Sequence, residues 1–183
     1  MKWLVMALML AGPAAAQTAL DTDFEKLVEE AGSQDEVVTH GVTIIRERMP
    51  NGPTSYEAFD GTDQGAVGCW MMIAVHASAM DRQCELSVNP SERAALDNLL
   101  GGIARFYAEN NVPIMPEGRD LVAVRSAIEM LIKGESTTII PENCTGEPAD
   151  FVESFVDNLS VTASEEHFQN VLGPKRIPVM SPC

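Results

Sequence analysis

The longest apolar run beyond the first twenty residues is segment 66–86, AVGCWMMIAVHASAMDRQCEL, and it predicts a buried central helix. At about 100° per residue, one arc of roughly 120° holds mainly sulfur-bearing residues: Cys69, Met72, His76, Met80 and Cys84. The opposite side carries polar residues: Ser78, Asp81 and Arg82. We therefore expect the sulfur-rich face to be apolar and buried and the other face to meet water.

Other segments have apolar residues at helical spacing between start and stop signals, and we expect them to be helices: 22–32, 90–110, 116–134, 148–159 and 162–173. The strongest start signal is Asn89-Pro-Ser-Glu92, which combines a cap residue, a proline at the first helical position and a glutamate at the third. Along 148–159 we expect Phe151, Val152, Phe155, Val156 and Leu159 to pack on one side.

Segment 37–60 has conflicting signals, because a capping-box pattern precedes a β-branched run that favours strand. The reversal signal at 50–53, Pro-Asn-Gly-Pro, favours a small hairpin of 42–48 and 55–60, and helix remains the alternative for this segment. A short β-branched run at 137–140 is a candidate extra strand. Prolines keep 175–183 out of helix, so we expect this tail to run extended across the surface. The fold class is therefore mainly α: a single-domain helical bundle around the central helix.

Residues 1–16 have a positive end, a short apolar run and an Ala-Ala-Ala site, which together predict a signal peptide. We expect a mature chain of 17–183 that forms one domain and is secreted or periplasmic and soluble, without membrane insertion after cleavage.

Four cysteines in an oxidising compartment predict two disulfides. Cys69 and Cys84 would lie roughly 22 Å apart along one helix, so they cannot bond each other. Two pairings remain: Cys69–Cys183 with Cys84–Cys144, or Cys69–Cys144 with Cys84–Cys183. We favour the first, because Cys84 and Cys144 both stand at ends of predicted elements, where chains commonly meet.

The chain has 27 acidic and 12 basic residues, a net charge of −15 that becomes −16 once Lys2 is removed with the signal peptide. This charge disfavours nucleic acid and anionic membranes as partners and leaves a basic protein or a cation. The alternative interpretation is that acidity only keeps the protein soluble.

Catalytic signatures are lacking in the sequence. It contains no G-x-S-x-G element, no C-x-x-C redox pair and no C-x-x-C-H haem motif, and its three histidines, His40, His76 and His167, are far apart. No cofactor is expected. A hydrolase without a recognisable motif ranks third among the functions considered.

The second-ranked function is binding of a soft metal such as copper, because Met72, His76 and Met80 are spaced four apart and thioether with imidazole suits copper. These ligands span roughly 12 Å of one helix, so Met115, Met130 or Met180 would have to complete the site. The competing interpretation is a core in which methionines fill gaps around one hydrogen-bonded histidine. We rank first a non-enzymatic binding protein for another macromolecule, with a basic protein as the expected partner.

Overall fold

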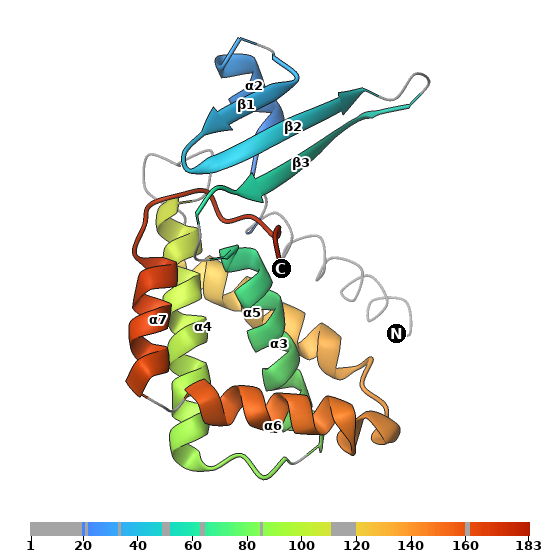
Figure 1. The fold of residues 1–183 in the computed structure, drawn as a ribbon. Coiled ribbons are helices and arrows are strands. Elements are labelled where there is room, and N and C mark those ends of the chain that lie inside the picture. The colour runs from blue at the N-terminus through green and yellow to red at the C-terminus, as the bar shows by residue number, and fades with distance from the viewer. Residues whose placement is uncertain are drawn as a thin grey trace.

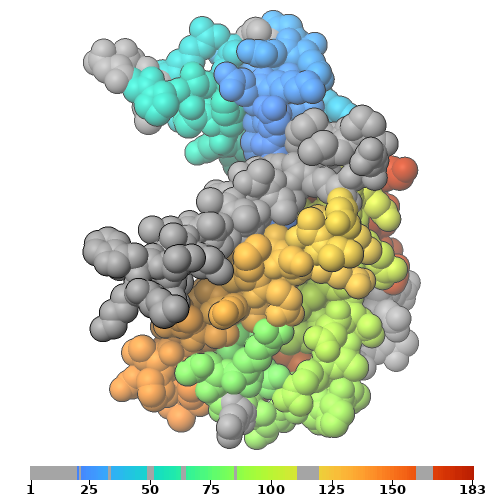
Figure 2. All heavy atoms as spheres, turned by 180° about the vertical axis from the view of Figure 1, so that it is seen from behind, coloured from blue at the N-terminus to red at the C-terminus, as the bar shows by residue number. Residues whose placement is uncertain are grey.

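The computed structural model describes residues 20, 22–32, 34–48, 52–62, 65–84, 86–110, 120–159 and 162–183, with backbone only for 162–166. The predicted signal peptide, residues 1–16, lies outside the described residues. The described chain is mostly helical, with six α-helices and a small antiparallel sheet (Figure 1). Seen from behind, the sheet residues, in blue and cyan, form one end of the molecule and the helices the other (Figure 2).

The sheet has three antiparallel strands in the order β1(Glu36–Thr39), β2(Val42–Arg48) and β3(Thr54–Asp60), and α2(Phe24–Glu30) packs against β1 and β2. The predicted hairpin is confirmed: Val42 pairs with Asp60 and Arg48 with Thr54. Segment 37–60, whose signals conflicted, also contributes to a third strand, β1. His40 and Gly41 both adopt positive φ and make the tight two-residue turn that lets β1 pair with β2. At the start of α2, Asp23 is the cap, and its side chain accepts a hydrogen bond from Lys26 N.

The helices are α3(Val67–Cys84), α4(Pro90–Asn110), α5(Leu121–Ser136), α6(Glu147–Leu159) and α7(Thr162–Leu172), with a 3-10 turn, η1(Pro141–Cys144), before α6. α3 packs against α4, α5, α6 and η1. The start signal of α4 is confirmed: Asn89 Oδ1 accepts from the backbone N–H groups of Ser91 and Glu92, and the Glu92 carboxylate accepts from Asn89 N. The helix expected over 116–134 corresponds to α5, which begins at Leu121. Residues 116–119, where that helix was expected to begin, lie outside the described residues.

Two hydrophobic cores meet at α3. The helix core joins α3 to α4, α5, α6 and α7, with Met80, Ile103, Ile132 and Val152 among its buried members. The sheet core joins the sheet and α2 to the first turn of α3 and to the tail: Leu27, Val28, Val37, Val42, Ile44, Ala66, Cys69, Ile177 and Val179. Helix α3 thus contributes to both cores: Cys69 and Ile73 pack in the sheet core, whereas Val67 and most of the other buried residues of α3 pack in the helix core.

The tail after α7 is extended, as predicted, but its expected place on the surface is wrong: residues 176–179 are buried. The tail runs between the sheet and α3 (Figure 1) and bonds to both. Ile177 N donates to His40 O at 3.0 Å, Gly68 N donates to Val179 O at 2.9 Å, and Asp60 N donates to Ser181 O at 2.8 Å. Because its backbone groups form hydrogen bonds with the sheet and with α3, this extended, proline-rich tail can be buried.

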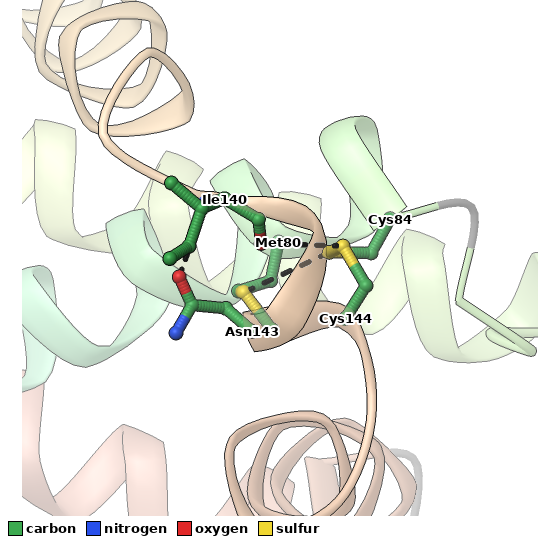
Figure 3. The surroundings of a disulfide bond; sticks show 5 residues. All are labelled: Met80, Cys84, Ile140, Asn143 and Cys144. Atoms are coloured by element: carbon green, nitrogen blue, oxygen red, sulfur yellow. Dashed lines mark hydrogen bonds between the residues drawn. A yellow bond between two sulfur atoms is a disulfide. The ribbon is translucent and has the colours of Figure 1, made fainter.

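The disulfides join Cys69 to Cys183 and Cys84 to Cys144, with Cα atoms 5.3 Å and 5.1 Å apart. These are the two pairs favoured from the sequence. The first fixes the tail to the start of α3, and the second joins the end of α3 to η1 (Figure 3).

The expected orientation of α3 is wrong in part. Met72 is 41% exposed although it was placed on the buried face, whereas Ser78, placed in water, is 5% exposed. Apolar residues occur on every side of this helix, so its sequence does not define one inward face. Asp81 is also partly enclosed, because Arg93 of α4 donates two hydrogen bonds to its carboxylate, at 2.7 and 2.8 Å.

The run at 137–140 is not a strand, which corrects that expectation. The hydroxyl groups of Thr137 and Thr138 instead donate hydrogen bonds to the carbonyl oxygens of Gly134 and Glu135. They thus supply donors for carbonyl groups in the last turn of α5.

Candidate functional site

Five aromatic side chains from three helices pack against one another. Trp70 comes from the start of α3, Phe151 and Phe155 from α6, and His167 and Phe168 from α7. The ring of Trp70 lies 5.1 Å from Phe168, 5.5 Å from His167 and 6.4 Å from Phe155, between ring centroids. Phe151 extends the row, 6.4 Å beyond Phe155 and nearly parallel to it. We call these five residues the aromatic face.

The aromatic face is only partly covered. Phe151 is 53% exposed and His167 is also exposed, whereas Trp70, Phe155 and Phe168 are half-buried. The geometry of α6 explains this, because Ala149, Val152, Val156 and Leu159 follow the three-and-four spacing that faces the core and are all buried. The expectation that Phe151 packs inside with them is therefore wrong.

The chain around the aromatic face is acidic. From residue 141 to 174 there is no lysine or arginine, and the acidic residues are Glu142, Glu147, Asp150, Glu153, Asp157, Glu165 and Glu166. On α6, Glu147, Asp150, Glu153 and Asp157 are exposed. Phe151 is thus exposed on a helix that also exposes four carboxylates, within a segment that has no basic residue.

A groove of about 760 Å³ adjoins this face, between α4 and the end of α7. Phe168 belongs to both the aromatic face and the groove, whose other lining residues include Ala95, Asn98, Arg105, Glu109 and Leu172. The groove therefore adds polar and charged side chains of α4 beside the aromatic face.

The predicted soft-metal residues lie in different environments. Met80 is fully buried, and its Sδ lies 4.0 Å from Cys84 Sγ of the disulfide (Figure 3). Met72 is exposed, and the ring of His76, 41% exposed, bonds through Nδ1 to Glu135 of α5 at 2.8 Å. Met72 and His76 thus share the open side of α3, and Met80 does not.

Of the candidate completions, Met130 is half-buried on α5, Met180 is 48% exposed on the tail, and Met115 lies outside the described residues. Within the described ranges, no group of three or more His, Cys, Asp or Glu residues is arranged to hold a metal ion.

The three histidines lie in separate parts of the structure. His40 is in the β1–β2 turn, where Nδ1 lies 2.7 Å from Thr39 Oγ1, His76 is on α3, and His167 is in the aromatic face. Folding does not bring them into one cluster.

Among the described residues, the titratable groups with a shifted pKa belong to α3, α4 and α5. Burial raises the pKa of Tyr107, in α4. Arg82 donates two hydrogen bonds to Glu129, at 2.9 and 3.0 Å, which lowers the pKa of that carboxyl and raises the pKa of Arg82. These bonds tie α3 to α5 and add no reactive group to the surface around Phe151.

The aromatic face was not predicted from the sequence. Its one local signal is the spacing of Phe151 and Phe155, which places the two rings one above the other on a helix. Trp70 and Phe168 join them only in the folded chain.

Comparison with protein-family models, with curated proteins and with solved structures gives no match. No helix in the described part of the chain is both long and apolar enough to cross a membrane.

Proposed function

We propose that this protein is a secreted or periplasmic binding protein without catalytic activity, and that its aromatic face holds a basic segment of another protein. In this proposal, the helical bundle around α3 is a rigid support for the face. The observation that carries the proposal is the continuous row of rings from Phe151 to Trp70, open to solvent at Phe151 and set in a segment without basic residues.

The exposed rings supply affinity. Fully burying a phenylalanine side chain contributes about 1.5–3 kcal/mol. Covering the open half of Phe151 and the edges of its neighbours therefore supplies part of the roughly 8 kcal/mol that micromolar binding requires. Aromatic residues also dominate the energetic centres of known protein interfaces.

The negative charge of the protein favours a basic partner. Lysine and arginine side chains bind both to carboxylates and over the faces of aromatic rings, and α6 presents the two groups side by side. A net charge of −15 also attracts cationic partners from a distance and repels acidic ones.

Trp70 provides a direct test. The chain has two tryptophans, Trp3 and Trp70, so a protein made without residues 1–16 has Trp70 as its single tryptophan, inside the aromatic face. We expect a peptide of alternating lysine and leucine to shift Trp70 fluorescence at low salt and to bind at least tenfold more weakly at 0.5 M NaCl. The matched glutamate–leucine peptide is expected to have no effect.

A pair of surface variants locates the binding. Phe151→Ser is expected to weaken binding of the lysine peptide at least tenfold, whereas Val122→Ser, which removes an exposed apolar residue of α5 that is 68% exposed, is expected to leave it unchanged. Equal binding by the two variants, or equal binding of both peptides, would overturn the proposal.

A further inference from the structure

Met180 of the tail lies directly over the first turn of α3. A Cβ atom on Gly68 would be 2.7 Å from Met180 Sδ, so the thioether rests on the helix backbone at the one position of this turn that has no side chain. The tail is held there on both sides of Met180, by the bond from Gly68 N to Val179 O and by the Cys69–Cys183 disulfide. The fold therefore keeps the backbone of Met180 beside the first turn of α3.

Met72 and His76 continue the line that starts at Gly68. Residues four apart lie one above the other on a helix, and their side chains lean toward its N-terminus. On this geometry we expect Met72 to lean over the turn of Gly68, where Met180 Sδ lies, and His76 to lean toward Met72. All three side chains are open to solvent: Met180 is 48% exposed, Met72 41%, and the ring of His76 41%.

Glu135 orients the histidine. His76 Nδ1 lies 2.8 Å from Glu135 Oε1, and a carboxylate can only accept this hydrogen bond, so Nδ1 carries the proton. In this tautomer Nε2 is the ring nitrogen that can offer a lone pair to a metal. Metal-binding histidines in proteins are commonly held by the same carboxylate contact, which fixes the ring and raises its basicity.

We propose that Met72, His76 and Met180 form a binding site for a soft monovalent cation, Cu(I), on the open side of α3. Two thioethers and one imidazole suit Cu(I), whereas hard cations such as Mg²⁺ and Ca²⁺ require oxygen ligands. The site replaces buried Met80 of the sequence hypothesis with Met180, which reaches α3 from a different segment of the chain.

The reach of the three side chains is sufficient. Gly68 and His76 are about 12 Å apart along the helix, so side chains of one helix alone cannot surround a metal over that distance. Here one ligand comes from the tail, and Met72 lies between the other two. Methionine has three rotatable side-chain bonds, so the two exposed thioethers can move toward the histidine, which Glu135 holds in place. The net charge of −15 further favours a cation at this surface.

The test is an anaerobic Cu(I) titration of the oxidised protein in competition with a Cu(I)-specific chromogenic chelator. We expect one Cu(I) per chain. Met180→Leu and Met72→Leu are each expected to lower the affinity at least tenfold. Met130→Leu, which changes a half-buried methionine of α5, and Met80→Leu are the matched controls and are expected to retain it.

A second readout reports the ligands directly. Ag(I), which prefers the same ligands and is not redox-active, is expected to shift the NMR methyl signals of Met72 and Met180 and to leave those of Met80 and Met130 in place. Absence of Cu(I) binding would overturn the proposal. Equal affinity in all four methionine variants, or methyl shifts spread over all methionines, would also overturn it and would indicate non-specific uptake.

Discussion

Arg176 of the tail and Asp60 at the end of β3 form an ion pair in which both side chains are about 1% exposed, with Nε and Oδ2 2.5 Å apart. The other guanidinium nitrogens donate to the carbonyls of Val171, Pro174 and Gly65, and the guanidinium carbon lies 5.3 Å from the ring centroid of Phe106. One side chain therefore joins the sheet, the tail, the loop before α3 and two helices.

Removing one partner of this pair is expected to be costly. Arg176→Met leaves the Asp60 carboxylate buried without its counter-ion, so we expect a loss of about 3–5 kcal/mol in the free energy of unfolding, measured in urea. The double variant Arg176→Met with Asp60→Leu is expected to regain part of this loss. Arg82→Ala, which breaks an exposed pair, is the control and is expected to cost less than about 1 kcal/mol. A similar cost for Arg176→Met and Arg82→Ala would contradict the assigned role.

Gly68 is expected to tolerate no side chain. In Gly68→Ala the new Cβ would be 2.6 Å from Val179 O, and overpacking of this kind costs about 1–3 kcal/mol. Gly101→Ala is the matched control, because nothing lies within 4 Å of its Cβ position in α4, and we expect it to stabilise the protein by about 0.5–1 kcal/mol. Thermal unfolding of the two variants measures the contrast, and destabilisation by Gly101→Ala would contradict the packing described for α4.

The Arg82–Glu129 pair makes a small contribution to stability that depends on pH. Because the hydrogen bonds from Arg82 lower the pKa of Glu129 in the folded state, the contribution is fully present above the ordinary glutamate value of about 4.3 and is lost as pH falls through the lower folded value. Both side chains are at least half exposed, so we expect less than about 1 kcal/mol.

The measurement compares Glu129→Gln with the unchanged protein by urea unfolding from pH 6 to pH 3. The stability difference is expected to shrink on acidification, and at pH 6 also to shrink in 1 M NaCl. A difference that grows toward low pH would have the wrong sign and would rule out this assignment.

Peptide mapping without reduction tests the crosslinks. We expect linked peptides that contain Cys69 with Cys183 and Cys84 with Cys144. The Cys84–Cys144 bridge closes a loop with a sequence separation of 60, so replacing both cysteines by serine is expected to cost about 4 kcal/mol. Any peptide linking Cys69 to Cys84 would mean that α3 is not one continuous helix.

Local signals in the sequence predicted much of the fold. Asn89 caps α4 through atoms within three residues of itself, and the β2–β3 hairpin follows a reversal signal in its own turn. Such features need no information from distant parts of the chain, so a single sequence is sufficient to predict them.

Features that depend on long-range contacts were not predictable in this way. Prolines in the tail indicated an extended segment, but its burial depends on Arg176 meeting Asp60, 116 residues away. The outward face of α3 depends on which neighbours cover an almost uniformly apolar helix. For the same reason Met80 was grouped with Met72, although the fold brings Met180 to that side of α3.

The position of the tail also has a consequence for biogenesis. Residues 176–183 complete the sheet core, pair with Asp60 and supply the partner of Cys69, yet they come after the sheet and α3 in the sequence. A chain that emerges from its N-terminal end exposes the sheet and α3 before the segment that closes them has arrived. The sheet core is therefore expected to close only after residue 183 has emerged, and until then Cys69 lacks its partner and is open to pairing with Cys144, which is made earlier.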